Sequence, residues 1–143
     1  MDCKDLMVGD WVNYWILNLN AKVFSILGNH TIGIQFVDKN NKVEAMHGLI
    51  EKVIRPIPLT SDILVKNGFE KQGDLYQYHI NAGNGYTRID IIDLQDGVWS
   101  YDIDVYDKFA DAHKIHHDDD CFLKLHQLQH LLRLCGIEKE ITI

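Results

Sequence analysis

The chain has 143 residues, of which 46% are hydrophobic and 24% are charged, and its formal net charge is −7. A chain of this length and composition can bury a core as one domain or two small ones, which excludes a disordered protein and removes any need for a metal or disulfide. The acidic balance argues against a protein that holds nucleic acid mainly through its phosphates.

Targeting signals and cysteine usage indicate the compartment. The longest apolar runs are far too short to cross a bilayer, and residues 1–5 show no basic segment followed by an apolar one. The cysteines, Cys3, Cys121 and Cys135, have no close spacing and leave an odd one over, which is typical of a reducing environment. We therefore expect a cytoplasmic protein that makes no use of a membrane.

Residues 1–57 are predicted to form a β subdomain. Strands are expected at about 7–15, 22–26, 31–37, 42–45 and 49–54, because β-branched and aromatic segments alternate there with turn signals such as Gly28-Asn29 and Gly48. Short strands joined by tight turns favour a small SH3-like β-barrel or a strongly bent sheet.

Residues 58–143 are predicted to form an α+β subdomain, and we expect the two subdomains to share one core. Pro56-Ile57-Pro58 ends the first sheet, and Thr60 caps a short helix that runs to about Asn67 and ends at Gly68. A β-meander follows, with strands at about 75–80, 86–94 and 98–101, and with 103–106 as a candidate continuation of the last strand.

A C-terminal amphipathic helix is predicted from Asp119 or Asp120 to Cys135, with Gly136 as its stop. Its leucines and cysteines cover an arc of about 200°, so the helix is expected to be covered on more than one side, and a homodimer is one way to cover it. The same geometry places His126 and His130 opposite Leu128, on a face expected to meet water.

Three motifs stand out in chain order: Gly9-Asp10-Trp11-Val12, the segment from Pro56 to Phe69, and Leu125-His126-Gln127-Leu128-Gln129-His130-Leu131 with Gly136 and Glu138. Together they resemble a family of small uncharacterised proteins of Bacteroidetes genomes, phages and mobile elements. The family pattern has Asn where this chain has His130. The resemblance implies no enzymatic activity, since none is assigned to the family.

Histidines of the last third are candidate metal ligands: His113, His116, His126 and His130. His126 and His130 have the i, i+4 spacing that lets two imidazoles share a zinc ion, but the segment between them lacks the glutamate of a zinc protease. Solvated or hydrogen-bonded histidines are the favoured interpretation, and a metal-dependent hydrolase is the alternative.

Aspartates concentrate between residues 90 and 120. This stretch contains ten aspartates and only two lysines, which give it a net charge of −8. A solvated sheet face is one interpretation. The other is a docking surface, built on Asp102, Asp104 and Asp107, for a protein partner with a basic surface. No calcium loop of the Asp-x-Asp-x-Asp-Gly type is present.

The aromatic residues Trp15 and Trp99, with Trp11 and Tyr14, are further candidates for a binding surface, although core positions are the favoured interpretation for two or three of the four. Taken together, the residues predict a non-enzymatic protein-interaction or accessory module of a phage or mobile element, without a cofactor. A nucleic-acid-binding small barrel is a further alternative, supported by the lysines of the first half and opposed by the acidic stretch.

Overall fold

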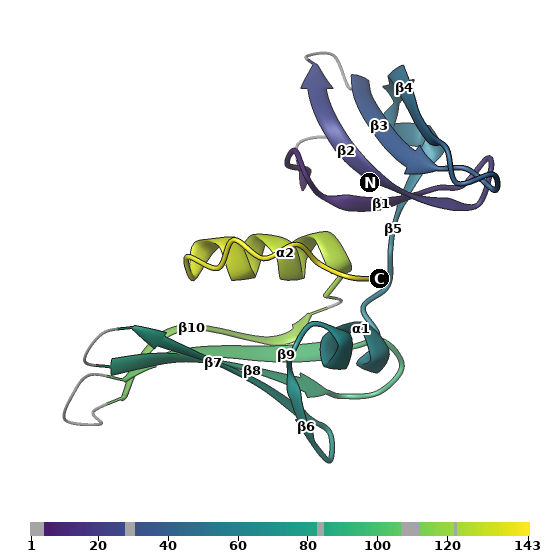
Figure 1. The fold of residues 1–143 in the computed structure, drawn as a ribbon. Helices are drawn as coiled ribbons and strands as arrows, with labels where there is room; N and C mark the ends of the chain where they lie inside the picture. The colour runs from purple at the N-terminus through teal and green to yellow at the C-terminus, as the bar shows by residue number, and fades with distance from the viewer. Residues whose placement is uncertain (1–4, 28–30, 83–84, 107–111, 122) are drawn as a thin grey trace. The chain divides into compact units, whose positions relative to one another are not determined.

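The computed structural model describes residues 5–27, 31–82, 85–106, 112–121 and 123–143, with only the backbone described at 50, 51, 82 and 112–121. The fold is α+β and consists mainly of antiparallel strands, as Figure 1 shows. The chain divides into two compact units: Met1–Ile57 with Lys124–His130, and Pro58–Leu123 with Leu131–Ile143. The predicted division had the same boundary after residue 57 but assigned residues 124–130 to the second subdomain.

The first unit contains one five-stranded sheet in the order β4-β3-β2-β1-β5. All of its strand pairs are antiparallel. Its elements are β1 Trp11–Tyr14, β2 Leu19–Leu27, β3 Thr31–Val37, β4 Val43–Ile50, the 3₁₀ helix η2 Glu51–Val53 and β5 Ile54–Pro56. Alternating residues of these strands bury a core that consists of Leu6, Val12, Tyr14, Ala21, Val23, Ile32, Ile34, Phe36 and Ile54.

Gly48 does not end a strand, contrary to the prediction of two strands at 42–45 and 49–54. It lies within β4 at φ +71, where the pairing with β3 shifts register between Ile32 and Ile34. A glycine at positive φ in such a bulge bends the strand without ending it. Gly48 therefore marks an unusual backbone conformation, but it does not mark the end of a strand. Opposite it, Gly33 packs so tightly that a Cβ would lie 2.3 Å from Ser25 Oγ.

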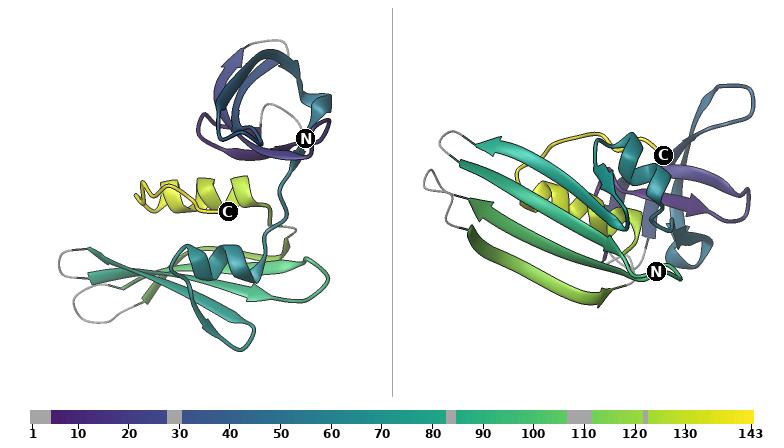
Figure 2. Two further views of the ribbon diagram at one scale, coloured as in Figure 1. Left: turned by 45° about the vertical axis from the view of Figure 1, so that its right-hand side comes forward. Right: turned by 90° about the horizontal axis from the view of Figure 1, so that it is seen from below.

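The second unit contains the other five-stranded sheet, in the order β10-β9-β8-β7-β6. The elements are the helix α1 Ser61–Lys66, the strands β6 Glu70–Gln72, β7 Leu75–Ala82, β8 Gly85–Asp93, β9 Trp99–Tyr106 and β10 Ala112–Cys121, and the helix α2 Leu125–Leu134, whose first half belongs to the first unit. Figure 2 (right) shows these strands side by side, with β10 in light green at one edge.

The short helix α1 is confirmed with its caps. Thr60 Oγ1 accepts a hydrogen bond from Ile63 N at 3.3 Å, and Gly68 at φ +85 follows the C-cap residue Asn67. These signals are local, because a cap acts within one turn of its helix, and a sequence pattern can therefore locate them.

The prediction for the last helix is wrong at its start. Residues 112–121, with Asp118, Asp119 and Asp120, form β10, which pairs with β9, and α2 begins only at Leu125. Pairing with a neighbouring strand outweighs the favourable placement of acidic residues at a helix N-terminus, which contributes only about 0.3–1 kcal/mol. Among the described residues no helix has both the length and the apolar character needed to cross a bilayer.

Candidate functional site

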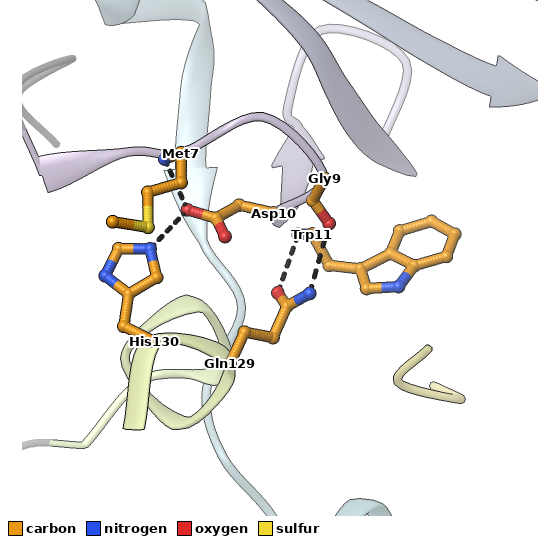
Figure 3. Close-up of polar contacts among 6 residues, drawn as sticks. All are labelled: Met7, Gly9, Asp10, Trp11, Gln129 and His130. Carbon is orange, nitrogen blue, oxygen red and sulfur yellow. Dashed lines mark hydrogen bonds and ion pairs between the residues drawn. The ribbon is translucent and has the colours of Figure 1, made fainter. Parts of the chain in front are cut away.

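The first half of α2 and the segment before β1 form a polar cluster inside the first unit (Figure 3). Asp10 is fully buried, and its Oδ2 accepts a hydrogen bond from Met7 N at 2.7 Å and lies 2.8 Å from His130 Nε2. A buried carboxylate needs such partners, because without them its desolvation would cost several kcal/mol.

Gln129 supplies the second half of this cluster. Its Oε1 accepts a hydrogen bond from Trp11 N at 2.9 Å, and its Nε2 donates one to Gly9 O at 3.1 Å. The amide therefore satisfies one donor and one acceptor of the backbone on either side of Asp10, as Figure 3 shows. Gly9-Asp10-Trp11 and Gln129-His130 belong to two of the sequence motifs described above, and they are the two halves of one hydrogen-bonded clamp.

His126 is buried, with 5% of its surface exposed, so the prediction that both imidazoles face water is wrong for this residue. Burial lowers the pKa of His126, although the nearby charge of Asp10 opposes the shift, and the ring is therefore neutral near pH 7. Its Nδ1 is buried and has no hydrogen-bond partner among the described residues. The ring lies 5.9 Å from that of His130 and nearly perpendicular to it, at 80°.

Among the described side chains, the histidines predicted to bind a metal ion do not form a metal site. His113 and His116 lie on β10, opposite Val105 and Ile103, but their side chains are outside the described part. Within the described ranges, no group of three or more histidine, cysteine, aspartate or glutamate side chains could hold a metal ion. His130 instead pairs with Asp10, and burial leaves His126 as a neutral ring beside it.

Arg88 organises the polar face of the second sheet. Its Nε lies 2.9 Å from Asp90 Oδ2 and its Nη2 lies 3.0 Å from Asp104 Oδ2, while Gln77 Nε2 donates to Asp90 Oδ1 at 2.9 Å. Burial works against the charge of Arg88, but Asp90 with Tyr106 and Asp104 raise its pKa overall. One guanidinium therefore offsets part of the negative charge of two neighbouring strands.

The remaining predicted contact residues lie in different environments. Asp104 is buried in its ion pair with Arg88, and Asp102 is half-buried opposite Asp90. Asp107 lies outside the described residues. Trp99 is a core residue, packed edge-on against Tyr76 at 5.9 Å, because its side chain points to the apolar face of the sheet. Neither Trp99 nor Asp104 offers an accessible side chain as a contact.

Trp15 is the predicted contact residue with an open surface. It opens the turn between β1 and β2, and the exposed fractions of Trp15, Ile16 and Leu17 are 45%, 52% and 53%. The indole is held in place, since Nε1 donates to Lys52 O at 3.0 Å and the Arg55 guanidinium lies 5.0 Å from the ring centroid. Ile16 and Leu17 were missed, although an apolar tripeptide at a turn position was a visible signal.

Two further exposed apolar residues, Val37 and Val43, flank the turn between β3 and β4. The antiparallel register places this turn and the β1–β2 turn at the same end of the sheet. We name this surface the exposed apolar end, which consists of Trp15, Ile16, Leu17, Val37 and Val43. Exposed basic side chains accompany it: Lys39, Lys42, Lys52 and Arg55.

Asp38 shapes the second of these turns. Its carboxylate accepts hydrogen bonds from Asn40 N and Lys42 N, both at 2.8 Å. The bond from Lys42, followed by those from Asn40, lowers the pKa of Asp38. This carboxylate is engaged in the turn and stays negatively charged between the exposed side chains of Lys39 and Lys42.

Comparison of the chain with family models, curated proteins and solved structures gave no match.

Proposed function

We propose that the protein is a non-enzymatic interaction module that binds a partner protein through the exposed apolar end. The observation that carries the proposal is the run Trp15-Ile16-Leu17, in which each side chain is about half exposed. Single apolar residues on a surface are ordinary, whereas three in succession at a hairpin turn, with two more at the same end, are typical of a contact surface.

The fixed indole of Trp15 supports this role. Its hydrogen bond to Lys52 O and its stacking on Arg55 restrain the ring before any partner arrives. A restrained aromatic side chain loses little conformational entropy on binding, and tryptophan and arginine are enriched among residues that dominate binding energy.

The surrounding charges indicate the chemistry of the partner. Lys39, Lys42, Lys52 and Arg55 are exposed around the exposed apolar end. We therefore infer a partner that offers an apolar patch with carboxylates at its rim, because complementary charges speed association and restrict partner choice. A partner with a basic surface, predicted from the aspartates, remains a proposal for the second unit, where Arg88 offsets Asp90 and Asp104.

Two finer assignments belong to the same proposal. An SH3-like arrangement of the first unit is supported by its short antiparallel strands, with β1 between β2 and β5 and with η2 immediately before β5. A cytoplasmic accessory protein of a phage or mobile element is supported by the motif resemblance and by the sparse cysteines.

Site-specific photo-crosslinking tests the proposed function. A benzophenone amino acid is introduced at Ile16 and, as a matched control, at Leu27, which is 56% exposed at the other end of β2. After irradiation in cells that carry the gene, we expect at position 16 a discrete adduct with the added mass of a protein, unchanged by nuclease, and none at position 27. Excess wild-type protein should suppress the adduct, and excess Ile16→Ser/Leu17→Ser protein should not.

The same experiment can reject the proposal. Equal adducts at the two positions would mean that position 16 has no special role. An adduct whose added mass is removed by nuclease would favour the nucleic-acid alternative, and one with the added mass of a lipid would indicate a membrane contact. Suppression by the double variant as effectively as by the wild type would also contradict it.

A further inference from the structure

The strand β7 is longer than its neighbour β6 on one side of the second sheet. β7 covers Leu75–Ala82, whereas β6 pairs only with Leu75, Tyr76 and Gln77. Among the described residues no strand pairs with the other edge of β7 from Tyr78 to Ala82, although β8 pairs with its inner edge throughout. An edge of this kind presents backbone N–H and C=O groups that a further strand can use.

A small open cavity of about 260 Å³ lies where this free edge begins, lined by Gly68, Glu70, Gln77, Tyr78, His79 and Lys139. Successive side chains of a strand point to opposite faces of its sheet. A cavity that touches Gln77, Tyr78 and His79 therefore lies at the edge of β7 and not on either face. All of these residues belong to the second unit.

The direction of β6 determines how an added strand would run. β6 is antiparallel to β7 and begins at Glu70. An added strand in line with β6, and like it antiparallel to β7, would lie on the N-terminal side of Glu70. It would pass Asn81 and Ile80 and then reach His79. Its C-terminal end would arrive at the cavity, where β6 blocks any further pairing with β7. A chain that ends there fits this geometry better than one that continues.

The cavity offers a cation at the point where that chain end would arrive. Lys139 Nζ donates to Asn67 O at 2.9 Å and lies 5.8 Å from the centroid of the Tyr78 ring. Buried Asn67 holds the same segment through Thr142, by bonds of 2.8 and 2.9 Å. Only one of the three ammonium N–H donors is used by Asn67, so the others are available to a carboxylate.

Gly68 lines the cavity between Lys139 and Tyr78. Its φ of +85 favours glycine, and a Cβ added there would make ordinary contacts of 3.4 Å with Lys139 Nζ and with the Tyr78 ring. Glu70 is the one carboxylate in the cavity lining, and it is exposed, so it opposes a second carboxylate only through water-screened repulsion.

We propose that this edge binds the free C-terminus of a partner protein, which adds as an extended strand to β7 and places its terminal carboxylate on Lys139. Backbone pairing with Tyr78–Ala82 supplies affinity, and the ammonium selects for a chain end. Side chains on alternate positions of the bound segment would lie beside His79 and Asn81 on one face of the sheet and beside Ile80 on the other. This site is in the second unit and is independent of the exposed apolar end.

The test uses the full chain and a library of random heptapeptides that carry free C-terminal carboxylates. Enriched peptides are synthesised in three forms, with a free carboxylate, with an amidated C-terminus, and with N-methyl groups on alternate backbone nitrogens. Fluorescence anisotropy then measures their affinity for the wild type, for Lys139→Met and for Lys66→Met, whose lysine is exposed on α1 and does not line the cavity.

The proposal expects the free-carboxylate peptide to bind best. Amidation or Lys139→Met should each weaken binding by about tenfold or more, N-methylation should abolish it, and Lys66→Met should leave it unchanged. The Ile16→Ser/Leu17→Ser variant should bind the peptide as the wild type does, which separates this proposal from the proposed function. Failure of the library to yield any peptide, or equal binding of the amidated form, would overturn it.

Discussion

Replacement of Gln129 by Leu tests the structural role of the clamp between α2 and the Gly9-Asp10-Trp11 segment. Leucine is close to glutamine in size and suits a helix, so the change removes two hydrogen bonds and little else. It leaves Trp11 N and Gly9 O without their side-chain partner. Each unsatisfied backbone group costs about 1–3 kcal/mol when water cannot replace the partner.

Both backbone segments are half-exposed, so water can recover part of this loss, and we expect the free energy of unfolding to fall by about 2–4 kcal/mol. Such a loss would be a large share of the 5–15 kcal/mol that is typical of a domain. Urea titration followed by tryptophan fluorescence measures it. The matched control is Gln127→Leu on the same helix, where the exposed side chain only accepts a bond from Lys124 N at 2.8 Å and the expected cost is about 0.5–1 kcal/mol.

Hydrogen exchange locates the effect. In Gln129→Leu the Trp11 amide should lose its protection, while the Gly9 amide, which donates to Val23 O at 2.7 Å, should keep it. Equal destabilisation by the Gln127 and Gln129 variants, or a Trp11 amide that stays protected, would refute the assignment of Gln129 as the structural link.

Three further outcomes follow from the same contacts. Burial lowers the pKa of His126 below its ordinary 6.5, so as the pH falls the unfolded state takes up a proton before the folded state does, and the free energy of unfolding decreases below about pH 6.5. His126→Leu should reduce this decrease between pH 7.5 and 5.5 in urea titrations, and an unchanged dependence of the free energy of unfolding on pH would contradict the prediction. Arg88→Leu should destabilise the second unit by about 2 kcal/mol, because Asp90 and Asp104 lose their counterion, and the added changes Asp90→Leu and Asp104→Leu should recover most of the loss in thermal melts. Thr60→Ala should cost about 1 kcal/mol through loss of the α1 cap, and a cost near zero in the same melts would show that the cap bond contributes nothing.

Local signals were sufficient for parts of the fold. The cap at Thr60, the stop at Gly68 and the turn signals around β3 each act within a few residues, and the elements beside them were predicted with small errors in their bounds. The strand β10 could not be found in this way, because its pairing with β9 is a tertiary contact and its run of histidines and aspartates has no alternating apolar pattern.

The environment of the histidines shows the same limit. Helical geometry relates His126 and His130 to the leucines of α2, but it does not reveal what packs on the face that carries them. The partner of His130 is Asp10, 120 residues away in the sequence, and a buried carboxylate there turns a face predicted to meet water into an interior contact. Trp15 was found as a candidate because it is aromatic, whereas its neighbours Ile16 and Leu17 resembled core residues.

The central claim is that partner binding resides in the exposed apolar end and that the histidine cluster only supports the fold. The direct test is the equilibrium affinity of the captured partner for two folded variants, Ile16→Ser/Leu17→Ser and His126→Leu. We predict a loss of at least about tenfold for the first variant and an unchanged affinity for the second. Full affinity in the first variant together with a loss in the second would contradict the account.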